Sequence, residues 1–159
     1  MEKFLTQLKG LVTNPVLLAC VFSWLSAQLI KTLIKLLSGK VHSVGELFEL
    51  LIWRTGSMPS SHSALVTTLC TTIGFRSGIN SDIFILAFCF FMVTIRDALG
   101  VRRSSGIQAH MINEIGDELN KQGVLNYKPI KEVQGHKPME VVIGCILGGV
   151  IGVAFSVLK

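Results

Sequence analysis

Four apolar stretches of roughly membrane-spanning length constrain this chain more than any other feature. A helix rises 1.5 Å per residue, so it needs about 20 mostly apolar residues to cross the hydrocarbon core of a bilayer. Half of the residues are hydrophobic and only 16% are charged, and the apolar residues come in blocks rather than in an amphipathic rhythm. The sequence therefore predicts an all-α, integral-membrane helical bundle, with residues 1–159 forming a single membrane-embedded domain. The predicted transmembrane helices cover about residues 16–37, 59–76, 83–101 and 140–158.

The charged and metal-binding residue types exclude some classes of function. The formal net charge is +5, but the lysines and arginines form no stripe interleaved with aromatic residues, and no nucleic-acid-binding motif is present. We therefore expect no nucleic acid as a partner, and the charge fits a membrane face or a phosphate-rich ligand instead. The sequence has no His-Glu-x-x-His pattern, and its four cysteines lie in apolar blocks without metal-ligand spacing. We expect neither a metal nor another cofactor.

The first apolar stretch follows an amphipathic segment and contains several polar residues. Residues 1–14 have helical spacing of apolar side chains, and we expect them to lie along the membrane interface as part of an uncleaved anchor. Gln28, Lys31 and Lys35 interrupt the apolar stretch. For the two lysines we favour snorkelling toward the membrane boundary over a buried functional role. Gln28 and Lys31 are one helical turn apart, so both could point into a bundle.

The last apolar stretch contains glycines at four-residue spacing. Gly144, Gly148 and Gly152 therefore share one face of a helix, and small residues on a shared face let another helix approach closely. This face predicts close packing, either within the bundle or in a homo-oligomer formed through the last helix.

A polar loop joins the second apolar stretch at residues 56–63, which read GSMPSSHS. Pro59 suits the first position of a helix, because its φ is already helical and its missing N–H has no partner there. The residues that follow offer hydroxyl groups, an imidazole and backbone N–H groups at the positive end of a helix dipole. This combination predicts a binding site for an anion, above all for phosphate.

The order of the four stretches brings the other polar clusters to the same side of the membrane. After its first and third crossings the chain is on one side, so the loop before the second stretch, the end of the third and the start of the fourth share that side. Arginine side chains bind phosphate oxygens, a histidine can attack phosphorus or carry a proton, and a carboxylate can fix the histidine tautomer. The clustered residues are Arg54, His62, Asp97, Arg102, Arg103, His136 and Glu140.

Three segments carry a resemblance to a known family. They are residues 58–64 (MPSSHSA), 97–103 (DALGVRR) and 135–141 (GHKPMEV). Over nearly its whole length the sequence resembles the divergent branch of the type-2 phosphatidic acid phosphatase superfamily, which is related to vanadium haloperoxidases. The resemblance implies that His62 is the general acid and that His136 is the nucleophile, which forms a phospho-histidine intermediate. It implies no metal.

Two departures from the family pattern change the expected phosphate ligands. The usual first motif, a lysine seven residues before Arg-Pro, is absent, and Arg54 is followed by Thr55. Ile130 occupies the arginine position of the usual third motif. We expect Arg102 or Arg103 to replace these ligands, with help from Arg54. The two arginines are adjacent, so at most one of them points squarely at a phosphate.

The remaining candidate residues have two interpretations each. Glu140 either orients His136, one helical turn away, or is a favourable acid in the first turn of a helix. Ser60 and Ser61 either bind phosphate or cap the helix. Asp97 pairs with an arginine rather than taking part in the chemistry.

The balance of positive charge predicts the orientation and, with it, the substrate. More lysines and arginines lie on the side of the motifs than on the opposite side, so the positive-inside rule places the motifs at the cytoplasmic face of a multi-pass cell-membrane protein. We expect a metal-independent lipid phosphatase that hydrolyses a phosphomonoester of the phosphatidylglycerophosphate or phosphatidic acid class. The alternatives are a non-enzymatic phospholipid-binding membrane protein or transporter subunit, and an isoprenyl pyrophosphate phosphatase.

Overall fold

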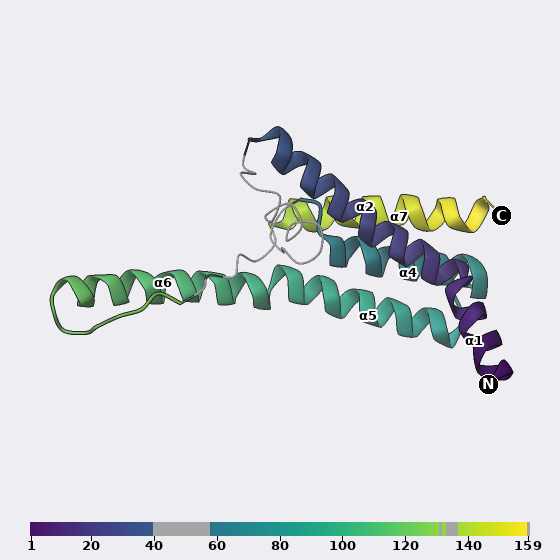
Figure 1. Cartoon of the computed structure of the whole chain (residues 1–159), viewed down its shortest axis with the longest axis horizontal. Helices are drawn as coiled ribbons and strands as arrows, with labels where there is room; N and C mark the ends of the chain where they lie inside the picture. The colour runs from purple at the N-terminus through teal and green to yellow at the C-terminus, as the bar shows by residue number, and fades with distance from the viewer. Residues whose placement is uncertain (40–57, 131, 133–136, 159) are drawn as a thin grey trace.

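The described part of the chain is built of helices. The computed structural model describes residues 1–39, 58–130, 132 and 137–158, with only the backbone of Arg102. These residues contain no strand, so the prediction of an all-α protein is confirmed. The helices, shown in Figure 1, are α1 (Glu2–Val12), α2 (Pro15–Leu37), α4 (Ser61–Ser77), α5 (Asp82–Leu99), α6 (Val101–Lys121) and α7 (Pro138–Val157).

Three helical stretches in the described residues are long and apolar enough to cross a membrane. They are α2, the joined helices α5 and α6, and α7. They correspond to the predicted spans 16–37, 83–101 and 140–158. Helix α2 begins after Asn14, whose side chain accepts hydrogen bonds from backbone N–H groups of the first turn. The predicted integral-membrane helical bundle is therefore confirmed.

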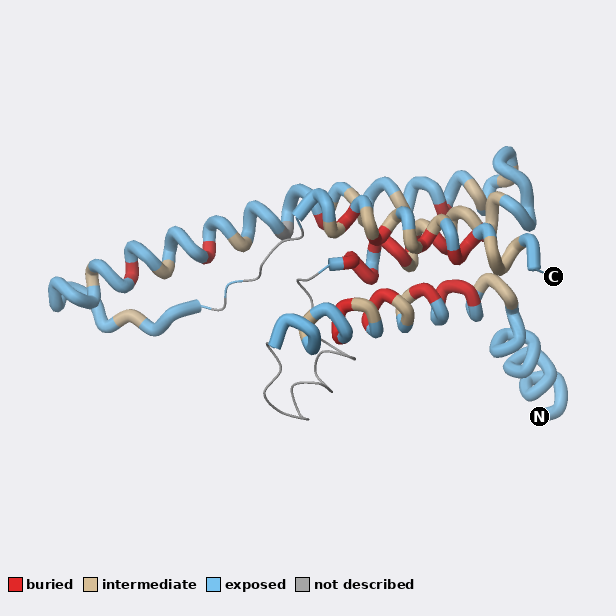
Figure 2. The backbone as a smooth tube through the Cα atoms, turned by 90° about the horizontal axis from the view of Figure 1, so that it is seen from above, coloured by how far each residue is buried: buried red, intermediate tan, exposed pale blue. Residues whose placement is uncertain are grey.

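The fourth predicted span, residues 59–76, corresponds to α4, which is only 17 residues long and is less apolar than the other three. Helix α4 contacts α2, α5 and α7. Figure 2 shows buried residues gathered inside this bundle, whereas α1 and most of α6 are exposed. The hydroxyl groups of Thr67, Thr68 and Thr72 donate to carbonyl oxygens one turn earlier, which satisfies them within the helix. A helix rich in hydroxyl groups can therefore occupy the interior of a membrane bundle.

The glycine face of α7 packs against α4. A Cβ atom at Gly144 would lie 2.5 Å from the carbonyl oxygen of Ser60, and one at Gly152 would lie 2.7 Å from Cβ of Thr71. A Cβ atom at Gly148 would collide with the carbonyl group of Ala64. The predicted close-packing face is confirmed. Because α4 of the same chain occupies it, a homo-oligomer, which stays a prediction, would have to form through another surface.

The helices alternate in direction, so their polar ends meet. Helices α2 and α5 run one way and α4 and α7 run the other way (Figure 1). We call the end where α2 and α5 finish and α4 and α7 begin the polar end of the bundle. The backbone N–H of Ser60 donates to the carbonyl oxygen of Glu140 at 2.9 Å and ties the starts of α4 and α7 together. The predicted convergence of these helix ends is confirmed, and α1 lies at the opposite end.

Helix α6 extends past the polar end as an arm, with residues 124–130 running back along it (Figure 1). We use "arm" for α6 together with residues 122–130 and 132. Tyr127 lies against Gly116, where a Cβ atom would be 2.5 Å from the ring. The Tyr127 hydroxyl donates to Oδ1 of Asn113 at 2.6 Å. The returning segment is therefore fixed to the helix by specific contacts.

Candidate anion-binding site

A serine fixes the start of α4 at the polar end. Ser60 Oγ accepts a hydrogen bond from the Ser63 hydroxyl at 2.9 Å and from the Ser63 backbone N–H at 3.4 Å. The helix therefore begins at Ser61. The prediction that Pro59 is the first helical residue is wrong, because the capping hydroxyl sets the start two residues later. Of the two roles considered for Ser60, the structure shows capping.

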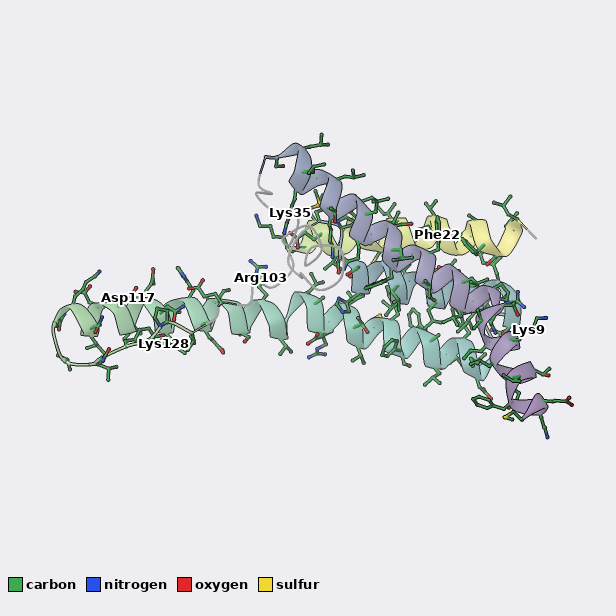
Figure 3. All side chains as sticks on the ribbon, in the orientation of Figure 1. Lys9, Phe22, Lys35, Arg103, Asp117 and Lys128 are labelled. Atoms are coloured by element: carbon green, nitrogen blue, oxygen red, sulfur yellow. The ribbon has the colours of Figure 1, made fainter. Side chains whose placement is uncertain are left out.

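Lys31 is buried in the bundle, with only 2% of its surface exposed. Its Nζ donates to Oε1 of Gln28 at 3.1 Å and to Oγ of Ser61 at 3.1 Å. The prediction that Lys31 snorkels is wrong, because its side chain lies on the α2 face that meets α4, where oxygen atoms compensate the ammonium. Lys35 is half-buried and lies at the polar end (Figure 3).

The contact between Lys31 and Ser61 leaves hydrogen-bond donors unused within the described residues. An ammonium group carries three N–H donors, and Gln28 and Ser61 accept two hydrogen bonds. The Ser61 hydroxyl accepts from Lys31 and still has its own hydrogen to donate, and no described residue accepts it. Ser61 is itself buried, with an exposed fraction of 3%. A buried positive charge with spare donors beside a helix start suits an anion.

His62 follows Ser61 in the first turn of α4, and its side chain is exposed. The residue that caps the helix is Ser60, so His62 does not serve as the cap. The position leaves the imidazole close in sequence to the buried donors of Ser61 and at the positive end of the helix.

Glu140 is the third residue of α7 and closes the first turn of that helix. Its Oε2 accepts from the backbone N–H of Lys137 at 3.3 Å, as expected for an acid at this position. The Glu140 carboxylate also interacts electrostatically with the ammonium of Lys31. Glu140 therefore supports the start of α7 and adds a compensating charge near Lys31. Its predicted action on His136 stays a prediction.

The acidic and basic residues between α5 and α6 also lie at the polar end. Asp97 is in the last turn of α5 and is half-buried, and Arg103 is in the first turn of α6 and is exposed (Figure 3). The side chain of Arg102 lies outside the described part of the chain. The predicted pairing of Asp97 with an arginine, and the choice between the two arginines as a phosphate ligand, stay predictions.

Two of the predicted site residues, Arg54 and His136, lie outside the described residues. The structure therefore tests neither the predicted nucleophile nor its distance from His62. Within the described residues, no group of three or more histidine, cysteine, aspartate or glutamate side chains is placed to hold a metal ion.

The burial of Lys31 agrees with the less favoured of the two sequence interpretations, in which Gln28 and Lys31 both point into the bundle. Gln28 and Lys31 form a polar pair three residues apart in an otherwise apolar helix, which is the spacing of residues that share a helix face. A polar pair on one face favours a buried partner helix over solvent. The partner could not be named, because it depends on how closely α4 approaches α2.

Comparison with known proteins identifies the family. Residues 12–151 match the family described as "Divergent PAP2 family". The "Uncharacterized membrane protein YuiD" of Bacillus subtilis (strain 168) is 35% identical over 149 residues, which cover 87% of this chain and 91% of that protein. No solved structure gives a significant match. The resemblance predicted from the three sequence segments is confirmed, and the chain belongs to the divergent PAP2 family.

Proposed function

We propose that this protein is a metal-independent lipid phosphatase that hydrolyses a phosphomonoester, of the phosphatidic acid or phosphatidylglycerophosphate class, at the polar end of its bundle. The observation that carries the proposal is the buried Lys31, hydrogen-bonded to Ser61 at the start of α4. Burying an ammonium in a membrane bundle costs on the order of several kcal/mol unless nearby groups compensate the charge. Charged residues inside transmembrane segments are therefore mostly functional. Membership in the divergent PAP2 family supports a phosphatase-related role.

The donors around Lys31 match what a phosphate monoester presents. A phosphate dianion offers several acceptor oxygens, and Lys31 and Ser61 each have a donor that no described residue uses. The side-chain amide oxygen of Gln28 accepts a hydrogen bond from the ammonium and helps to hold it in place. Such preorganised donors act most strongly in a site that excludes water, where they stabilise the charge that develops on the phosphoryl oxygens.

The proposed reaction has two steps. His136 attacks phosphorus, so that an N–P bond forms while the P–O bond to the lipid alkoxide breaks, and His62 gives its proton to the departing oxygen. Water then attacks the phospho-histidine, gives a proton to His62, and releases inorganic phosphate and free His136. Lys31 stays charged throughout and holds the phosphoryl oxygens. Glu140, Arg54, Arg102 and Arg103 keep their predicted supporting roles.

A binding protein without turnover is the second candidate. The observation that favours it is the hydrogen bond from the Lys137 backbone N–H to Oε2 of Glu140, which gives this carboxylate a structural role at the start of α7. Such a protein would retain the donors around Lys31 and bind a lipid phosphate without hydrolysing it. A pyrophosphatase acting on isoprenyl chains is a third candidate and would use the same anion site. The three candidates predict different results with defined substrates: hydrolysis of a lipid phosphomonoester, no hydrolysis, or hydrolysis of an isoprenyl pyrophosphate.

Phosphate release by the purified protein in EDTA tests the proposal. The substrates are phosphatidic acid, phosphatidylglycerophosphate and an isoprenyl pyrophosphate. We expect release from the lipid monoesters, and a loss of at least about 100-fold in kcat/KM for both His62→Ala and His136→Ala, in the usual range for a general acid or a nucleophile. His110→Ala, on the exposed arm, is the matched control and should keep the full rate. Full activity in both His62→Ala and His136→Ala would overturn the mechanism, and phosphate binding without release from any substrate would establish the binding protein.

A further inference from the structure

An apolar groove of about 570 Å³ runs between α2 and α4. Residues of α2 from Val16 to Trp24 form one wall, and Leu65 and Leu69 of α4 form the other. Asn14 lies at the far end, but its Oδ1 is used to accept hydrogen bonds from the first turn of α2. The groove therefore offers a hydrocarbon surface, of the size of pockets that hold small ligands.

The two helix faces that line the groove also carry the residues of the anion site, beyond the end of the groove. On α2 the spacing of three and four residues places Leu17, Val21, Trp24, Gln28 and Lys31 on one helix face. The first three line the groove, and the last two belong to the buried polar pair.

The wall formed by α4 has the same continuity. Ser61, Leu65 and Leu69 are spaced by four residues and share one face of that helix. Ser61 accepts the hydrogen bond from Lys31, whereas Leu65 and Leu69 line the groove. The open groove ends at Trp24 and Leu65, and the anion-site residues follow on the same helix faces, in the buried contact between α2 and α4. We call this line of residues the track. It has a charged head at the polar end and an apolar body further along.

The dimensions of the track fit a phosphate ester of a long hydrocarbon chain. Lys31 and Trp24 are seven residues apart on α2, which corresponds to about 10 Å along the helix axis. Lys31 and Leu17 are 14 residues apart, or about 21 Å, so the track follows most of one crossing of the hydrocarbon core. A hydrocarbon chain attached to a phosphate at Lys31 would enter the groove at Trp24 and extend toward Leu17.

From this continuity we infer that the groove between α2 and α4 seats the hydrocarbon chain of the phosphate-bearing ligand, so that the protein selects long-chain over short-chain phosphate monoesters. The inference rests on the proposed function for the position of the phosphate. It adds a second binding element, because a chain held in the groove raises the effective concentration of the phosphate at Lys31.

Quenching of Trp24 fluorescence by brominated chains tests the inference without any turnover. The chain contains two tryptophans, so Trp53→Phe leaves Trp24 as the reporter. The probe is an alkyl phosphonate with bromine atoms about 10 Å from phosphorus, the expected distance between Lys31 and Trp24. Its C–P bond cannot be hydrolysed by the proposed reaction. The comparison probe carries the same brominated chain on phosphocholine, and both are diluted into phosphatidylcholine nanodiscs.

We expect the phosphonate probe to bind more tightly, because it makes charge-assisted hydrogen bonds to Lys31. The content of phosphonate probe in the nanodisc that gives half-maximal quenching should be at least about tenfold lower than that of the phosphocholine probe. Val21→Phe, which narrows the groove from an exposed position, should abolish this preference. The matched control Leu25→Phe, also exposed on α2 but outside the groove lining, should retain it. Equal quenching by both probes, or an unchanged preference in Val21→Phe, would overturn the inference.

The outcome is separable from that of the proposed function. A preserved phosphonate preference without phosphate release from any lipid would leave the groove assignment standing and refute the phosphatase. Phosphate release with equal kcat/KM for short-chain and long-chain monoesters would support the phosphatase and contradict the groove.

Discussion

The bundle and the arm each contain a polar network that includes an amide side chain, and the two networks differ in burial and in how many of their hydrogen-bonding groups have partners. In the bundle, Gln28 accepts from Lys31, which also donates to Ser61 across the gap between α2 and α4. In the arm, Asn113 joins α6 to the returning segment. The first network is buried, whereas most members of the second are exposed.

The two networks differ in whether all of their hydrogen-bond donors have an acceptor among the described residues. Asn113 uses its amide completely: Nδ2 donates to the Ile130 carbonyl oxygen and to Glu132 Oε1, and Oδ1 accepts from the Tyr127 hydroxyl and the Ile130 N–H. Lys31 and Ser61 each keep a donor that no described residue uses. A completed network stabilises a structure, whereas the spare donors of the buried network are the ones that the proposed function assigns to a phosphate group.

The largest expected effect concerns the close approach of α4 and α7, which holds the bundle together. Gly148→Leu places a side chain against the Ala64 carbonyl group, and we expect a loss of at least about 3 kcal/mol in stability, seen as loss of folded protein in detergent. Gly149→Leu is the matched control, because a Cβ atom there meets nothing within 4 Å, and it should stay within about 1 kcal/mol of the wild type. Equal effects of the two substitutions would refute the packing of α4 on this face of α7.

Replacing the buried charge should separate stability from function. Lys31→Met keeps the shape of the side chain and removes an ammonium that is only partly compensated, so we expect the free energy of unfolding to change by less than about 1 kcal/mol or to rise. Phosphate release should fall at least about 100-fold, the usual cost of losing one electrostatic contact to the transition state. Reversible unfolding in detergent and the phosphate assay measure the two effects. A variant that is both strongly destabilised and inactive would show that Lys31 is structural.

The amide of the arm should behave in the opposite way. Asn113→Ala removes four hydrogen bonds that fix the returning segment, and we expect the Ile130 amide to exchange with solvent at least about tenfold faster, because about 1.4 kcal/mol of local stability is lost. Phosphate release should be unchanged. Gln108→Ala is the control for hydrogen–deuterium exchange, because Gln108 is an exposed residue of α6 whose side chain donates a hydrogen bond to Ser104 within the same helix. Loss of activity in Asn113→Ala with intact activity in Gln108→Ala would contradict the division between the two networks.

The smallest expected effect is the pH response of the arm. The hydrogen bond from Asn113, and then that from His110, lowers the pKa of Glu132 below its usual range. The stabilisation is therefore present above the ordinary glutamate pKa and is lost as the pH falls through the lowered pKa. We expect the NMR signal of the Asn113 side-chain amide to shift over this acidic range in the wild type and to stay constant in Glu132→Gln. A shift of equal size in the variant would assign the titration to another group.

The sequence predicts the arrangement of the bundle because that arrangement depends on local patterns. The lengths of the apolar stretches give the helices, their alternation gives the polar end, and the spacing of Gly144, Gly148 and Gly152 gives the close-packing face. The position of Lys31 could not be predicted in the same way, because snorkelling and burial fit the same helix pattern until the partner helix is placed. The start of α4 at Ser61 likewise depends on a competition between Pro59 and the Ser60 cap that only the folded backbone decides.

The affinity of the purified protein for inorganic phosphate, measured by phosphorus NMR titration in nanodiscs, tests the central claim most directly. The claim is that Lys31 and Ser61 hold a phosphate group at the polar end. We predict that Lys31→Met binds phosphate at least about tenfold more weakly than the wild type, since it loses a charge-assisted hydrogen bond. Lys9→Met, at the opposite end of the bundle (Figure 3), should bind phosphate as the wild type does. Equal phosphate affinity in the wild type and in Lys31→Met would contradict the claim.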